Sequence, residues 1–403
     1  MKTNIKNPEL SIYVHIPFCV QKCLYCDFLS GPASKEKIDR YIEALCKEIS
    51  WYRSIFRKHT IRSVFLGGGT PSILDAGQIE KLMSTIAEQA ELNIKAERQP
   101  EITMEANPGT LTKEKLEACW KSGINRLSIG LQSADNEELK RLGRIHTYEE
   151  FLQSYSLARE TGFQNINIDL MSGLPGQSME TFLETLLKVL ELKPEHISSY
   201  SLIVEEGTPF YKIYGEGKGE DMLPDDELDR AMYHKTRALL YESGYEQYEI
   251  SNYAKPGLES RHNISYWTSI PYLGLGLGAS SLYEHKRFHN KSSMEDYLTF
   301  VEQTDSVKIM TETEFAMPGA YIEESLTVNA EMDEFMILGL RMIQGVSYTE
   351  FKQRFGKTIK EIYPKQLKRF LEEKLLIESK DRLMLTDRGI DVSNRVFMEF
   401  LRD

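Results

Sequence analysis

Residues 13–28 read YVHIPFCVQKCLYCDF. The stretch begins as a short apolar strand and then carries three cysteines, Cys19, Cys23 and Cys26, separated by three and then two residues. Thiolates are the soft ligands that iron–sulfur clusters and zinc prefer. A disulfide would leave one thiol over, and structural zinc usually takes four protein ligands. No fourth cysteine follows nearby, so we predict a metal centre with an incomplete set of protein ligands; the spacing alone leaves a blander structural site open.

Short apolar strands alternate with amphipathic helices from residue 11 to about residue 205. We predict strands at 11–16, 61–66, 101–106, 126–129, 165–170 and 196–202, with helices at about 35–57, 76–90, from 112, 148–161 and 179–190. Such alternation produces parallel βαβ units. About six units predict an α/β fold with a partial, open TIM-like barrel, and a doubly wound open sheet is the competing architecture.

Polar or glycine-rich residues follow most of the predicted strands, and the cysteine loop follows the first one. The strand ends carry Gly68, Gly69, Thr70, Glu105, Gln132 and Asp169. Each of these could equally serve a turn, because strand ends favour such residues. Likewise, Arg144 could pair a carboxylate with its fork of donors or be a solvated cation. Because the carboxyl ends of barrel strands share one rim, their convergence with the cysteines predicts a catalytic or ligand-binding loop.

The rest of the chain changes pattern twice. Residues 206–310 are less regular, with a helix expected at 226–241 and a strand at 246–250. Beyond residue 311 we predict helices at 331–342, 347–355, 364–373 and 387–401, and a hairpin at 376–379 and 382–385. Helices followed by a β wing predict a winged-helix-like module. The expected domains are therefore 1–205 (the partial barrel), 206–310 (an α+β extension) and 311–403 (the module).

Composition limits the function. The 403 residues carry a net charge of −12, which argues against a general nucleic-acid binder and favours a docking or lid role for the module. No apolar run reaches the roughly 20 residues that span a bilayer, and residues 1–10 are too polar for a signal peptide. We therefore predict a cytoplasmic protein without a transmembrane segment. The two remaining cysteines, Cys46 and Cys119, fall in helical patterns and are predicted to be packing thiols.

The cysteine spacing, with aromatic Tyr25 before the last cysteine, resembles the radical S-adenosylmethionine (SAM) superfamily. That resemblance implies a [4Fe-4S] cluster with one iron free of protein ligands. In the superfamily this iron binds the amine and carboxylate of SAM, and the reduced cluster splits SAM to a 5'-deoxyadenosyl radical.

The order of the candidate residues is similar to the family of oxygen-independent coproporphyrinogen III dehydrogenase. The similarity extends through residues 142–146 and 169–176 and covers most of the chain, including the C-terminal module. It implies that Cys19, Cys23 and Cys26 ligate the cluster. It also implies that the SAM pocket is lined by Tyr13, Tyr25, Gly68, Gly69, Thr70, Glu105, Gln132, Arg144 and Asp169.

One departure favours a particular branch of that family. The dehydrogenase carries an additional cysteine where this chain has Phe28, and it has a longer segment ahead of the first strand. Both features resemble the haem chaperone branch, HemW. Residues 262–267 are similar to its H-N-x-x-Y-W motif, which implies haem binding by His262, Tyr266 and Trp267. A histidine can ligate iron and aromatic rings can pack on a porphyrin, but the residues alone would equally fit a loop histidine beside core aromatics.

We therefore expect a radical-SAM-type haem chaperone that binds a [4Fe-4S] cluster, SAM and haem. It would deliver haem to respiratory or other haem-requiring proteins. A peripheral contact with membrane respiratory enzymes and a homodimer are both compatible with this interpretation. The first alternative is coproporphyrinogen III dehydrogenase of porphyrin biosynthesis, and the second is a structural zinc-binding module.

Overall fold

The computed structural model describes residues 7–94, 99–304 and 320–402. Its centre is a 12-stranded sheet in the order β12-β11-β10-β9-β1-β2-β3-β4-β5-β6-β8-β7. The neighbouring parallel strands are β9 (Tyr272–Leu275), β1 (Glu9–Ile16), β2 (Thr60–Gly68), β3 (Glu101–Ala106), β4 (Arg126–Gln132), β5 (Ile166–Ser172) and β6 (His196–Ser201). The antiparallel edges are β10 (Ser280–Tyr283), β11 (Lys286–His289) and β12 (Tyr321–Ser325) on one side, and β8 (Asn252–Ala254) and β7 (Glu246–Glu249) on the other. No pairing among the described strands joins the two edges, so the barrel is open, as predicted.

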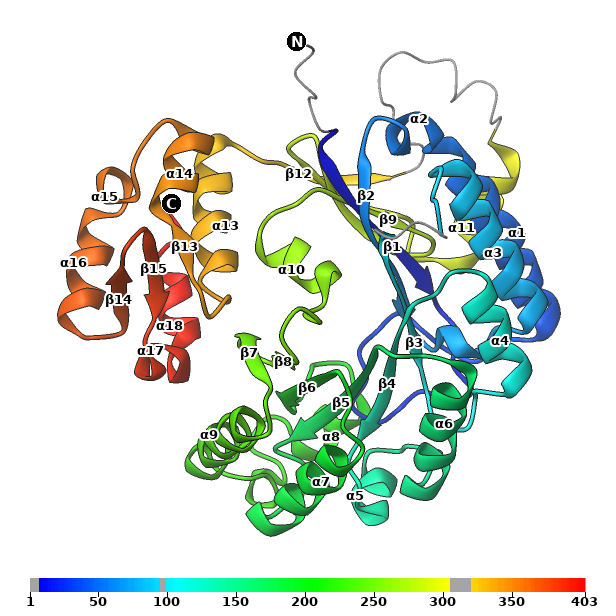
Figure 1. Cartoon of the computed structure of the whole chain (residues 1–403), viewed down its shortest axis with the longest axis horizontal. Coiled ribbons are helices and arrows are strands. Elements are labelled where there is room, and N and C mark those ends of the chain that lie inside the picture. The colour runs from blue at the N-terminus through cyan, green and yellow to red at the C-terminus, as the bar shows by residue number, and fades with distance from the viewer. Residues whose placement is uncertain (1–6, 95–98, 305–319, 403) are drawn as a thin grey trace.

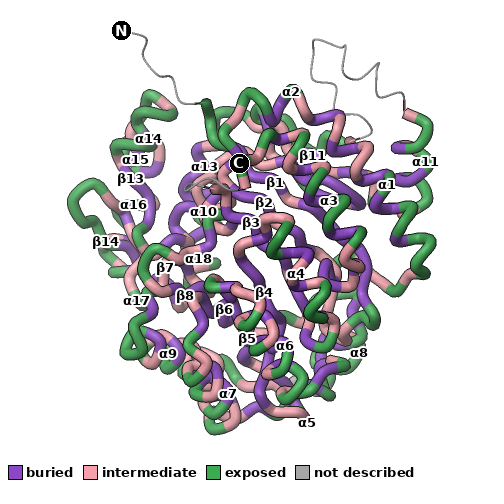
Figure 2. Tube along the Cα trace, turned by 45° about the vertical axis from the view of Figure 1, so that its right-hand side comes forward, coloured by how far each residue is buried: buried purple, intermediate pink, exposed green. Residues whose placement is uncertain are grey.

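Helices cover the outer face of the parallel strands (Figure 1). They are α1 (Lys35–Trp51), α2 (Arg53–Phe56), α3 (Ala76–Gln89), α4 (Lys113–Lys121), α5 (Asn136–Arg141), α6 (Tyr148–Thr161) and α7 (Met179–Glu191), followed along the chain by α8 (Pro209–Tyr214), α9 (Asp226–Glu242) and α11 (Met294–Gln303). Side-chain caps explain several helix starts: Asp75 begins α3 and Thr147 begins α6, each with a capping box. The strands are largely buried, whereas the outer helices keep exposed faces (Figure 2).

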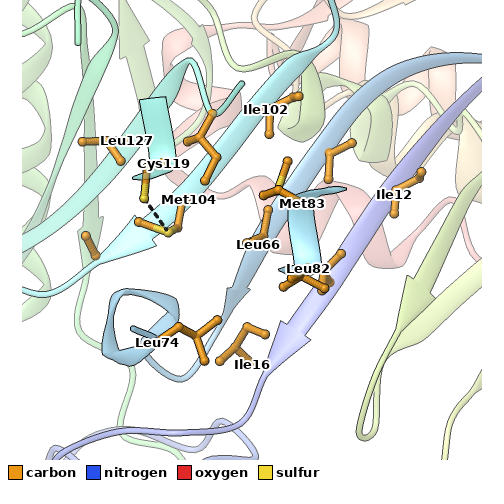
Figure 3. Packing of buried hydrophobic residues seen from close by; sticks show 14 of the residues in the cluster. Ile12, Ile16, Leu66, Leu74, Leu82, Met83, Ile102, Met104, Cys119 and Leu127 are labelled. Atoms are coloured by element: carbon orange, nitrogen blue, oxygen red, sulfur yellow. Dashed lines mark hydrogen bonds between the residues drawn. The ribbon is translucent and has the colours of Figure 1, made fainter. Parts of the chain in front are cut away.

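The core between sheet and helices follows from alternation along the strands. On β3, Ile102 and Met104 face outward and are fully buried against helices α3 and α4, where they pack near Leu82, Met83 and Leu127 (Figure 3). The thiol of Cys119 lies 3.8 Å from the Met104 sulfur, and Cys46 packs against the same cluster. The prediction of a buried packing thiol is confirmed for Cys119, whereas Cys46 packs against the core but is only partly buried.

Several sequence-based boundaries were wrong. The helix predicted at 35–57 is interrupted at Tyr52, and β8 follows the strand predicted at 246–250 after a tight turn. The parallel strand β9 was missed. The residues around His262 form helix α10 (Arg261–Trp267) rather than a loop. This helix lies on the concave side of the sheet, against β2 and next to the C-terminal module (Figure 1).

The C-terminal module has its own apolar core. Its elements are α13 (Val328–Gly339), β13 (Val346–Ser347), α14 (Tyr348–Phe355), α15 (Ile359–Ile362), α16 (Pro364–Glu372), β14 (Leu376–Ser379), β15 (Arg382–Leu385), α17 (Asp387–Asp391) and α18 (Ser393–Met398). The hairpin gains β13 to form a three-stranded sheet. The predicted last helix breaks at Val392. Helices with a small sheet agree with the winged-helix-like module, while its boundary at 311 lies outside the described residues and the domain limits stay predictions.

Candidate cofactor site

The cysteine loop is a closed excursion between β1 and α1. Its two ends are tied by hydrogen bonds from the Cys19 amide to the Gly31 carbonyl (3.0 Å) and from the Gly31 amide to the Pro17 carbonyl (3.1 Å). The His15 ring lies beneath the loop and contacts the Leu29 carbonyl through Nε2 at 2.9 Å. All the cysteines are free thiols, and Cys19 is buried. Backbone contacts therefore fix the loop before any ligand binds.

The three predicted metal ligands and nearly all of the predicted SAM residues line one cavity of about 340 Å³. Its walls include Cys19, Cys23, Tyr25, Cys26, Gly68, Gly69, Thr70, Glu105, Gln132, Arg144 and Asp169. These residues come from the carboxyl ends of β1 to β5 and the segments that follow them. The expected convergence at one rim of the barrel is thus present. Tyr13 alone lies off the cavity wall, with its hydroxyl 3.0 Å from His15 Nδ1.

The glycine loop after β2 supports the cysteine loop. A Cβ on Gly69 would lie 2.6 Å from the Phe18 carbonyl oxygen, so only glycine fits there without moving the backbone. The Thr70 amide donates to the same carbonyl at 2.7 Å. Gly68 has a φ of +108° and its amide donates to Glu105 Oε2 at 3.1 Å. The two loops form one unit with a backbone surface facing the cavity.

Arg144 places a positive charge beside the thiols. Its Nη1 lies 3.6 Å from Cys23 Sγ, and its Nη2 donates to Asn107 Oδ1 (2.9 Å) and the Gly130 carbonyl (2.6 Å). Burial raises the pKa of the neighbouring Tyr25 hydroxyl well above its usual range. A three-thiolate iron–sulfur centre is anionic, so a partly buried guanidinium next to one sulfur fits it. The donor set and the cavity together suit a [4Fe-4S] cluster.

Two carboxyls face each other across the cavity. Burial, followed by the charge of Asp169, raises the pKa of Glu105 to about 8. Burial also raises the pKa of Asp169, although Asn167 (2.7 Å) and Ser128 (3.1 Å) donate hydrogen bonds to it. These carboxyls are acceptors that a cationic ligand with hydroxyl groups would satisfy.

A β-bulge aims Gln132 into the cavity. Gln132 has a φ of +73°, unusual for a residue other than glycine, at a register shift between β4 and β5. Its Oε1 accepts a hydrogen bond from the Tyr200 hydroxyl at 3.3 Å. Sequence reasoning missed Tyr200 and Asn107, both of which line the cavity, and His15. The position of His15 on the first strand, two residues after Tyr13, was the available signal.

The segment predicted to bind haem lies elsewhere. His262 is 1% exposed and sits inside the barrel, where its ring stacks on Phe65. Its Nδ1 lies 2.9 Å from Ser63 Oγ and its Nε2 lies 2.9 Å from the Tyr266 hydroxyl. Burial, followed by the charge of Arg126, lowers the pKa of His262 to about 3, so the ring is neutral. The structure therefore does not bring His262, Tyr266 and Trp267 to the cavity that holds the cysteines.

Among the described residues, no three histidine, cysteine or acidic side chains converge closely enough to hold a single metal ion. A cluster is larger than one ion, because each thiolate binds a different iron. The same part of the chain contains no helix whose length and apolar character would let it cross a membrane.

Comparisons with known proteins identify the family of this chain. The model of the radical SAM superfamily matches residues 13–189, and that of the HemN C-terminal domain matches residues 326–392. The heme chaperone HemW of Lactococcus lactis is 37% identical over 98% of this chain and 97% of its own length. HemW of Bacillus subtilis is 35% identical over 97% of this chain and 99% of its own.

A solved structure has a closely similar fold. Coproporphyrinogen III oxidase (HemN) from Escherichia coli, described as a radical SAM enzyme, superimposes with a TM-score of 0.82. It is 25% identical, and the match covers 98% of this chain and 90% of that one. Since the HemW relatives match along almost their whole length, the chain belongs to the HemW family of the radical SAM superfamily.

Proposed function

We propose that this protein is a haem chaperone of the radical SAM type. Cys19, Cys23 and Cys26 would hold a [4Fe-4S] cluster, the cavity beside them would hold SAM, and the protein would deliver haem to haem-requiring proteins. The observation that carries the proposal is one cavity that gathers the three thiols with the glycine loop and partly buried carboxyls, in a chain that matches HemW proteins along nearly its whole length.

The residues of the site have separable roles in this proposal. The thiolates hold the cluster, and Arg144 offsets its negative charge. The glycine loop lets the backbone approach SAM. Glu105, Gln132 and Asp169 accept hydrogen bonds from the ammonium and hydroxyl groups of SAM. When bound, the cluster and SAM supply the radical chemistry of the superfamily.

The finer points of the proposal concern partners and location. Respiratory enzymes are the haem recipients that we favour, reached in the cytoplasm or by a peripheral contact at the membrane. Assembly as a homodimer belongs to the same proposal. Each can be tested by co-purification and by molar mass in solution, with and without haem.

The second candidate is coproporphyrinogen III dehydrogenase, favoured by the structural similarity to HemN. Phe28 argues against this candidate, because it stands where the dehydrogenase carries its additional cysteine. Phe28 is 61% exposed and lines the cofactor cavity. A structural zinc module is the third candidate, and the glycine loop and carboxyls that line the same cavity as the thiols argue against it, because a purely structural site needs neither.

The test begins with reconstitution of the cluster without oxygen. We expect iron and sulfide to bind the wild type, to be lost from Cys23→Ser, and to be retained by Cys46→Ser, a matched change at a packing thiol. Haem is then titrated, and coproporphyrinogen III is supplied with SAM and a reductant. Formation of vinyl groups at enzymatic rates would favour the dehydrogenase, whereas zinc in place of iron would favour the structural module.

A further inference from the structure

The location of His262 raises the question of where haem could bind. An axial ligand needs a ring nitrogen that faces the iron. Both ring nitrogens of His262 are within hydrogen-bond distance of Ser63 and Tyr266, and the ring is fully enclosed. Ligation would therefore require both hydrogen bonds to break and the ring to leave the barrel.

Helix α10 is also anchored against such a movement. The carboxylate of Glu101 accepts from the amides of Arg261 (2.9 Å) and His262 (3.1 Å) and from Ser260 Oγ (3.3 Å). At the other end of the helix, the Arg341 guanidinium covers the Trp267 ring at 4.4 Å. His262 therefore offers no open surface to a porphyrin, whereas partly buried Trp267 lines, together with Tyr266, a separate cavity of about 260 Å³ whose walls do not include the cysteines.

Four exposed apolar side chains surround the cofactor cavity instead. They form what we call the apolar rim: Val20 (55% exposed), Phe28 (61%), Ile145 (50%) and Ile203 (68%). Phe28 and Ile203 line the cofactor cavity itself. Val20 and Ile145 line a small adjoining cavity that shares Cys23 and Arg144 with it. Apolar side chains grouped in this way around a cavity mark a binding surface.

We propose that the haem cargo lies flat on the apolar rim, over the mouth of the cofactor cavity, and that His262 is not its ligand. This inference rests on the proposed chaperone function. The porphyrin face would cover Phe28 and Ile203, which otherwise expose apolar area to water. Exposed Lys22, whose Nζ lies 2.7 Å from the Phe28 carbonyl, offers a cation to a propionate. Haem held at the surface stays accessible to an acceptor protein, as delivery requires.

The test compares haem binding by anaerobically reconstituted proteins at equal cluster content, measured from the Soret absorbance. The rim variant combines Phe28→Ser and Ile203→Ser. Its matched control combines Ile377→Ser and Met398→Ser, which are exposed at 49% and 67% in the C-terminal module. We expect the rim variant to bind haem at least tenfold more weakly, Lys22→Gln a few-fold more weakly, and the control like the wild type.

His262→Gln completes the set, because glutamine can keep a polar contact inside the barrel. We expect it to retain the haem affinity and the Soret maximum of the wild type. Wild-type affinity in the rim variant would overturn the placement, as would loss of haem from a folded His262→Gln. Absence of haem binding by the wild type would contradict the chaperone function itself. Haem binding by the wild type together with equal binding by the rim variant would contradict only the placement, so the two failures can be told apart.

Discussion

Glu105 makes the stability of the ligand-free folded protein depend on pH. Its pKa of about 8 lies above that of an ordinary glutamate because the carboxyl is desolvated and faces Asp169. Between about pH 4.5 and pH 8 the folded protein holds a proton that the unfolded chain has released. This group therefore stabilises the fold fully only below about pH 4.5, and the stabilisation is lost as the pH rises through 8.

Glu105→Gln should remove that dependence. We expect the ligand-free variant to match the wild type at pH 4.5 and to be more stable by about 2 kcal/mol at pH 9, a value moderated by the carboxyl's contact with the open cavity. Urea unfolding at both pH values measures the difference. An equal stability difference at the two pH values would contradict the raised pKa.

Gly69 tests the coupling of the two loops. Its missing Cβ leaves space for the Phe18 carbonyl, next to the first cysteine. In Gly69→Ala the two backbones must separate, so we expect less than half of the wild-type iron content after reconstitution and a loss of about 2 kcal/mol. Gly77→Ala, in helix α3, is the control, because its Cβ would meet nothing closer than 3.5 Å and alanine favours helix. Normal iron content in Gly69→Ala would show that the glycine loop and the cysteine loop are not coupled.

At the scale of elements, the position of helix α10 depends on the hydrogen bonds of one carboxylate. Glu101, at the start of β3, accepts from Ser260 and from the first two amides of the helix. Glu101→Ala leaves these donors without a partner, and those of Ser260 and His262 are buried, so we expect a loss of about 3 kcal/mol in the free energy of unfolding. Glu114→Ala, at an exposed position in α4, should change stability by less than about 0.5 kcal/mol. Thermal unfolding of the two variants makes the comparison.

This anchoring explains which elements sequence could predict. The strands and helices of the first 200 residues carry strong periodicity and local caps, such as the capping box at Asp75, so the sequence predicts them well. Helix α10 is seven residues long, and its acceptor lies 160 positions earlier in the chain. Strand β9 has four residues and pairs with β1, which lies far earlier in the chain. Short elements held by distant partners leave no local pattern.

The same distinction holds for the site. The cysteines, the glycine loop and Asp169 could be predicted to meet, because the ends of parallel strands share one rim. Gln132 was predicted at the same rim, but the bulge that turns its side chain into the cavity and its hydrogen bond with Tyr200, near the end of β6, are not visible in sequence. His262 shows the opposite case: the sequence predicts a haem ligand at this position, but the side chain is buried inside the barrel.

At the scale of the whole molecule, the C-terminal module meets the barrel through charged pairs, a backbone bridge between Glu249 and Met342, and an apolar contact of Ile250 with the module's core. Its apolar core is separate from that of the sheet. The contacts between them include Arg287 with Glu334 (2.5 Å) and Arg237 with Asp387 (2.5 Å). Arg341 adds a contact with the Trp267 ring. Such pairs weaken in salt, whereas apolar cores do not.

Arg341→Ala should therefore loosen the module without unfolding it. The change removes the cation over Trp267 and the ion-pair partner of Glu249 (3.9 Å), so helices α10 and α13 should exchange amide hydrogens about tenfold faster. Helix α3, on the far side of the sheet, should exchange as in the wild type. Arg369→Ala, whose partners Glu373 and Glu399 lie within the module, is the control. Raising salt to about 1 M should reproduce the effect in the wild type, because it screens the same contacts; unchanged exchange in α10 would show that apolar packing holds the module in place.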